Sequence, residues 1–124
     1  MNCKCAFIVY TSTLGDVELD NFINTIGIEP GITEERLYYG LNKRTVEEDF
    51  QLSVFIHESL SGVLDKGLIL KELKDKFNCF YELNIKFSLD EGDVIDFDMY
   101  NLNDEIEQFI KITDTYYNLT TIEK

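Results

Sequence analysis

The sequence predicts a single α+β domain over residues 1–124, with a mostly antiparallel sheet of about five to six strands and three helices packed on one face. Two kinds of pattern point to this class. In several short stretches apolar and polar residues alternate, as in strands that bury one face. In three others apolar residues recur at the spacing of a helical stripe. The length of 124 residues and a hydrophobic content of 44% suit one domain with a substantial core.

The first third predicts a strand followed by a helix. Residues 5–12 are rich in β-branched and aromatic side chains, and Asp16 can cap the helix that follows. Gly27 is placed to end this helix, and Pro30 prevents its continuation. The helix should bury one apolar stripe, formed by Leu19, Phe22, Ile23 and Ile26.

The middle of the chain predicts two strands and a second helix. Residues 31–49 are the least regular part, with a short strand at 36–41 and a loop of mixed charge after it. Residues 50–57 alternate between apolar and other side chains and predict a strand. A helix capped by Asp65 then runs to Phe77. Its buried stripe comprises Ile69, Leu70, Leu73 and Phe77.

The last third predicts a hairpin, a third helix and a final strand. Residues 79–89 alternate as the longest strand, residues 90–93 form a tight turn that uses Gly92, and residues 94–100 return antiparallel. Asn103 caps the third helix, and residues 117–122 add the last strand. The stripe of this helix is formed by Ile106, Phe109, Ile110 and Thr113.

Charge is the main indication of function. The chain has 24 acidic and 11 basic residues, a formal net charge of −13, which repels nucleic acids and anionic lipid and favours a basic protein partner. Eight acids and no base lie in residues 90–107. The helix dipole explains those that begin the third helix, but not those of the predicted hairpin. The expected partner-binding residues are therefore Asp90, Glu91, Asp93, Asp96 and Asp98.

Chemical sites are expected to be absent: we predict no catalytic residue, no metal and no cofactor. The alternatives are a small enzyme that uses His57 or the Asp96/Asp98 pair, and a structural, self-assembling domain. No catalytic signature accompanies His57. The three cysteines lack the spacings of a zinc site, and Cys5 and Cys79 fit buried positions at strand starts.

The location in the cell is expected to be cytoplasmic. No apolar run approaches the roughly 20 residues that cross a bilayer. The amino-terminal segment, MNCKCAFIVYTSTLG, fits a first strand better than a signal peptide.

Three stretches carry a resemblance to a known family. CAFIVY is followed by LDNFINTIGIEP, FQLSVFIHESL is followed by an amphipathic helix, and the chain closes as strand, helix and strand. In these features it resembles the bacterial family catalogued as domain of unknown function 4279. The resemblance implies a small bacterial cytoplasmic domain without an assigned activity. Small acidic bacterial domains of this size include immunity proteins, which neutralise toxins, so we expect a non-enzymatic domain that inhibits a basic protein in that way or as a nucleic-acid mimic.

Overall fold

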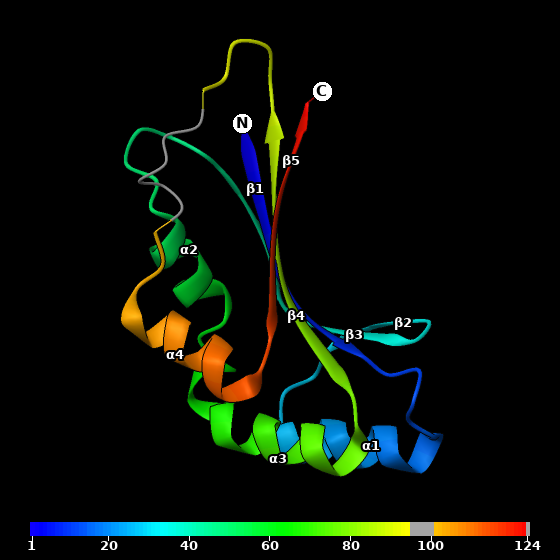
Figure 1. Cartoon of the computed structure of the whole chain (residues 1–124). Helices are drawn as coiled ribbons and strands as arrows, with labels where there is room; N and C mark the ends of the chain where they lie inside the picture. The colour runs from blue at the N-terminus through cyan, green and yellow to red at the C-terminus, as the bar shows by residue number, and fades with distance from the viewer. Residues whose placement is uncertain (95–100, 124) are drawn as a thin grey trace.

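The structure, a computed structural model, is described for residues 1–94 and 101–123. It consists of one five-stranded sheet with helices on one side, as Figure 1 shows with the sheet seen almost edge-on. This confirms the predicted α+β class and the mostly antiparallel sheet. Two ranges, 95–100 and 124, lie outside the described residues, and most of the predicted return strand at 94–100, with Asp96 and Asp98, falls there.

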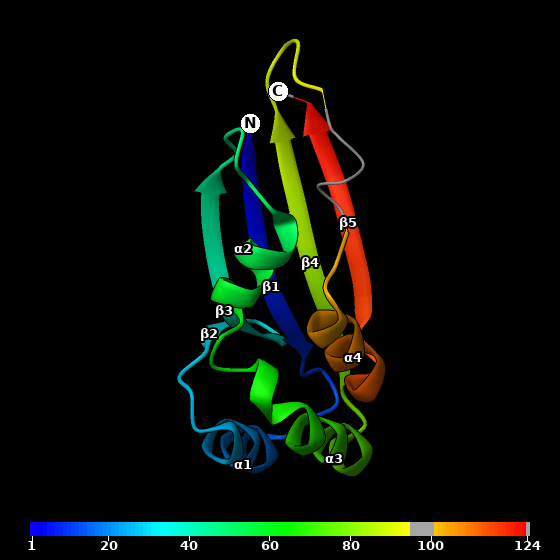
Figure 2. The ribbon, with the colours of Figure 1, turned by 90° about the vertical axis from the view of Figure 1, so that its left-hand side faces the viewer.

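The strands follow the order β2-β3-β1-β4-β5 across the sheet (Figure 2). Neighbouring strands are antiparallel except for the parallel pair β4 and β5. The neighbours of β4 are thus β1 and β5, whereas the sequence predicted that residues 94–100 pair with this strand as a hairpin. The strands are β1 (Asn2–Tyr10), β2 (Gly31–Thr33), β3 (Arg36–Thr45), β4 (Phe80–Leu89) and β5 (Tyr116–Glu123).

The described residues form four α-helices, one more than predicted. They are α1 (Asp16–Ile26), α2 (Leu52–Ser59), α3 (Gly67–Phe77) and α4 (Asp104–Thr113), and a short 3-10 helix (Leu64–Lys66) precedes α3. Gly27 ends α1 at a φ of 75°, as predicted, and the Asn103 side chain caps α4 by accepting from the Ile106 N–H at 2.9 Å. Two predicted caps were wrong, because Gly15 precedes α1 and Lys66 precedes α3.

The additional helix replaces the strand predicted at residues 50–57, which was wrong. The alternation there also contains a helical stripe, and α2 buries Leu52, Phe55 and Ile56 while Val54 remains 45% exposed. A short apolar run fits both periods, so packing decides between them. Here α2 packs against β1 and β3 on the face of the sheet. A strand in its place would have to pair at a free edge of the sheet.

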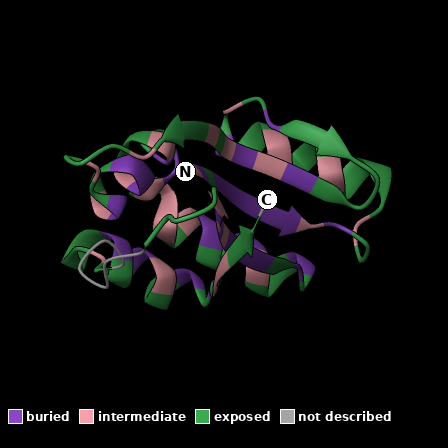
Figure 3. Ribbon diagram, turned by 90° about the horizontal axis from the view of Figure 1, so that it is seen from above, coloured by how far each residue is buried: buried purple, intermediate pink, exposed green. Residues whose placement is uncertain are grey.

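The core lies between the sheet and the helices, and Figure 3 shows buried residues running along the middle strands. The Tyr81 hydroxyl donates to the Leu70 carbonyl oxygen at 2.6 Å and so links β4 to α3 inside the core. The predicted stripes supply this core: Phe22 and Ile26, Leu70 and Leu73, Ile106 and Phe109 are buried. The sheet contributes alternate residues of three strands, namely Cys3, Cys5, Phe7 and Val9 of β1, Leu37 and Tyr39 of β3, and Tyr81, Leu83, Ile85 and Phe87 of β4.

An irregularity in β3 sets which of its side chains face the helices. The register between β1 and β3 shifts between Cys5 and Phe7, so β3 carries one extra residue near Gly40. Gly40 has a φ of 63°, and a Cβ there would lie 2.5 Å from the Ser59 carbonyl oxygen. Beyond the bulge, Asn42 and Arg44 reach α2. The predicted short strand at 36–41 therefore extends to residue 45.

Candidate functional site

Seven of the 22 described acidic residues lie at one end of the sheet. The register places Thr45, Asn2 and Ser88 side by side, so the chain segments that follow β3 and β4 leave the sheet at the same end, where β5 also stops. Both termini lie at this end (Figure 1). We call the carboxylates there the acidic end: Glu47, Glu48, Asp49, Asp90, Glu91, Asp93 and Glu123.

Three predicted binding residues lie in the turn after β4. The Asp93 N–H donates to the Asp90 carbonyl oxygen at 3.1 Å, the Asp90 N–H donates to the Asp93 carboxylate at 2.6 Å, and Gly92 has a φ of 84°. The predicted turn is therefore confirmed. With Leu89 and Glu123 it encloses a hollow of about 350 Å³ whose charged side chains are all carboxylates.

The amino terminus partly neutralises this turn. The Met1 ammonium lies 3.0 Å from the Asp90 carboxylate and 3.4 Å from that of Asp93. Its hydrogen bond to Asp90 is the main cause that raises its pKa above the ordinary value of 8.0. Two of the predicted residues thus hold the start of β1, while Glu91 is exposed.

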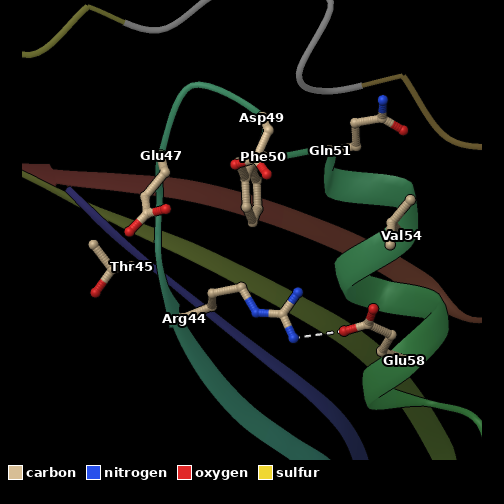
Figure 4. A pocket seen from close by; sticks show the side chains of 8 residues that line it. All are labelled: Arg44, Thr45, Glu47, Asp49, Phe50, Gln51, Val54 and Glu58. Carbon is tan, nitrogen blue, oxygen red and sulfur yellow. Dashed lines mark hydrogen bonds and ion pairs between the residues drawn. The ribbon is translucent and has the colours of Figure 1, made fainter.

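A larger hollow of about 490 Å³ lies between the end of β3, the following loop and α2 (Figure 4). Arg44 forms an ion pair with Glu58 across it at 2.5 Å, and its guanidinium lies 5.4 Å from the centre of the Phe55 ring. Glu47 and Asp49 also line this hollow, so carboxylates outnumber cations. Such a site suits a cationic group, and ordinary sequence patterns did not reveal it because it depends on where α2 packs.

His57 lies on α2 and contacts a carboxylate. Its Nε2 is 3.0 Å from the Glu105 carboxylate, and both side chains are largely solvent-accessible. The two serines of α2 are engaged elsewhere: Ser59 Oγ donates to the Phe55 carbonyl oxygen and Ser53 Oγ to that of Asn101. Among the described residues no hydroxyl or thiol is hydrogen-bonded to His57, so no nucleophile–base pair is formed there.

All three thiols are free and buried. Burial raises the pKa of Cys3 and of Cys5 to about 12, and it also raises that of Cys79. Thiols in this state are poor nucleophiles and poor metal ligands at neutral pH. Within residues 1–94 and 101–123, no group of three or more histidine, cysteine or acidic side chains is arranged to hold a metal ion.

Comparisons with known proteins give no match: no family model, no curated protein and no solved structure is similar at a significant level. The resemblance to the bacterial family therefore stays a prediction. Over the part of the chain that is described, no helix has the length and apolar character needed to cross a bilayer.

Proposed function

We propose that this chain is a non-enzymatic domain that binds a basic protein partner and neutralises it, as an immunity protein or a nucleic-acid mimic does. The observation that carries the proposal is the acidic end. Seven carboxylates lie there, six in the segments that follow β3 and β4 and one at the end of β5, and among the described residues the Met1 ammonium is the cation that forms ion pairs with them.

Electrostatics supports a basic partner in two ways. A net charge of −13 attracts cations at long range and raises the association rate, and a local excess of carboxylates sets the orientation of docking. Like charges held together lower the stability of a free protein, and a basic surface relieves their repulsion. Glu91, Glu47 and Asp49 are exposed and available for such contacts.

The proposal includes Asp96 and Asp98, which lie outside the described residues and come between the turn and α4 in the sequence. It also includes a cytoplasmic location and the relation to the bacterial family. A nucleic-acid mimic and an immunity protein differ in the partner, which is a nucleic-acid-binding protein in the first case and a toxin in the second.

The test begins with proteins captured from a host lysate by the wild-type chain. Titration calorimetry then compares the wild type with the double variant Glu47→Lys, Glu91→Lys against the purified partner. We expect the affinity to fall by at least tenfold and the wild-type affinity to weaken as salt rises. Glu72→Lys, a charge reversal on the exposed side of α3, serves as the control and should bind like the wild type.

The Asp96→Lys, Asp98→Lys variant tests the remaining predicted residues. Its melting temperature should equal or slightly exceed that of the wild type, because two like charges are removed, while its affinity falls. Equal affinities of both double variants and the wild type would refute a role for the acidic end.

A further inference from the structure

Among the described residues, no helix covers one face of the sheet, and the residues of this face follow from the strand register. Side chains alternate along a strand, and the core takes the odd-numbered residues of β1 and β4, so the even-numbered ones lie on the opposite face. We call this the open face, and it is visible in Figure 1 as the side of the sheet away from α2 and α4. From the α1 end toward the acidic end its rows are Arg36–Tyr10–Phe80, Tyr38–Ile8–Glu82–Tyr116, Ala6–Asn84–Asn118, Lys43–Lys4–Lys86–Thr120 and Thr45–Asn2–Ser88–Ile122.

Three lysines lie side by side in one of these rows. Lys4 is directly opposite Lys43 on one side and Lys86 on the other. Like charges opposite each other on neighbouring strands destabilise a sheet. None of the three ammonium groups forms an ion pair or hydrogen bond with a described residue. Although the described part of the chain is rich in acids, this row has no acidic partner within it.

Glu82, on the same face, is an acidic residue that lacks a basic partner among the described residues. Its side chain is only 8% exposed, and it is the only buried charged residue in the described part of the chain. Its carboxylate accepts from the Tyr10 hydroxyl at 3.2 Å and from the Asn84 amide at 2.8 Å, but no cation lies within ion-pair distance among the described residues. A buried carboxylate without a cation lowers stability.

One arrangement brings a lysine of this row to Glu82. We propose that the open face docks against the open face of a second copy of this chain, about a twofold axis that runs across the strands at the Ala6–Asn84–Asn118 row. Rotation about this axis places each strand over the same strand of the second copy, with the two running in opposite directions. A row on one side of the central row therefore meets, in the second copy, the row at the same distance on the other side.

Two of the three lysines then face a complementary group, while Lys4 lies over Ile8 of the partner copy. Lys86 faces Glu82 of the partner copy, and Lys43 faces Tyr38 of the partner copy, a cation over an aromatic ring. The other twofold axis in the plane of the face, parallel to the strands, would place the lysine row over itself. Charge therefore selects the first axis, and small side chains in the central row allow two sheets to approach to about 10 Å.

The size of the face is sufficient for a stable pair. Four strands of eight to ten residues, about 4.8 Å apart, cover roughly 600 Å² in plan, near the roughly 800 Å² of accessible surface that each partner buries in a standard interface. Exposed apolar groups add to it, since Phe80, Tyr116 and Ile122 are 47%, 56% and 44% exposed. Aromatic side chains of this kind dominate many interfaces. These residues differ from those of the acidic end, so the proposal is independent of the proposed function.

Sedimentation equilibrium of the whole chain tests the proposal. We expect the wild type to dimerise, and Lys86→Glu to weaken the dimer by at least tenfold because two carboxylates then face each other. Glu82→Lys should do the same with two ammonium groups. An equimolar mixture of these two variants should form a heterodimer, because each new side chain then meets an opposite charge. Lys71→Glu, on the exposed side of α3, should leave the dimer unchanged.

A second variant covers the case in which Glu82→Lys does not fold. Asn118 lies in the central row, on the edge strand β5, and faces Asn118 of the second copy. Asn118→Lys therefore brings two ammonium groups together in the dimer and should also yield a monomer. A wild type that stays monomeric across the concentration range, or a dimer that persists in both Lys86→Glu and Asn118→Lys, would overturn the proposal. In that case the open face is free for a different molecule.

Discussion

Gly40 on β3 lies directly against Ser59 at the end of α2, and a Cβ on Gly40 would come within 2.5 Å of the Ser59 carbonyl oxygen and 2.6 Å of Leu60 Cδ2. Gly40 also has a positive φ of 63°. This contact brings the carboxyl end of α2 onto the sheet, and it allows Arg44 and Glu58 to meet across the larger hollow.

Replacement of Gly40 with alanine should therefore be costly. We expect Gly40→Ala to lower the free energy of unfolding by roughly 2–4 kcal/mol, from left-handed backbone strain and overpacking together. Gly92→Ala is the matched control, since its φ is 84° and nothing lies within 4 Å of the added Cβ. It should cost only about 1 kcal/mol, from strain alone. Urea denaturation measures both; equal losses would show that α2 does not pack closely at Gly40.

The second prediction concerns the buried stripe of α1. Phe22 is fully buried and its ring centre lies 6.4 Å from that of Tyr81. Phe22→Ala should destabilise the protein by roughly 3–5 kcal/mol, as for other buried aromatic side chains. Val17 on the same helix is 74% exposed, so Val17→Ala should change stability by less than about 0.5 kcal/mol. A thermal melt of Phe22→Ala that matches the wild type would contradict this placement of the helix.

The third prediction concerns alkaline pH. Burial raises the pKa of Cys3 and of Cys5 from 9.0 to about 12, so both thiols stay protonated in the folded protein while they ionise in the unfolded chain. The stability of the folded protein therefore does not depend on these thiols' ionisation below pH 9, and it falls as the pH rises from 9 toward 12. Denaturant midpoints should fall over this range, and less steeply in Cys3→Val, which has one thiol fewer. At pH 8 iodoacetamide should label all three cysteines only after unfolding; rapid labelling of native protein would count against their burial.

The fourth prediction concerns the cap of α4. Asn103 Oδ1 accepts from the Ile106 N–H at 2.9 Å. Asn103→Ala should lower stability by about 1 kcal/mol, whereas Asn103→Asp retains an acceptor and should be nearly neutral. Equal losses in the two variants, measured by urea denaturation, would mean that the side-chain acceptor is not what stabilises this helix end.

The sequence alone determined the elements whose signals are local. The stripes of α1, α3 and α4, the Asn103 cap, the long alternating strand β4 and the turn at Gly92 all depend on residues within a few positions of each other. Interactions at this range are the same in any context that buries the apolar face, so periodicity and capping residues are sufficient to predict them. The α+β class follows from their order.

Tertiary structure decided the rest. Residues 52–59 fit a strand or a helix, and only their packing against β1 and β3 selects the helix. The extra residue near Gly40 and the parallel pairing of β5 with β4 set which side chains become neighbours. They bring Glu47, Asp90 and Glu123 to one end of the sheet and align Lys43, Lys4 and Lys86 in one row. Residues far apart in sequence meet only through strand register, which is fixed by the packing of the whole core and not by any local pattern.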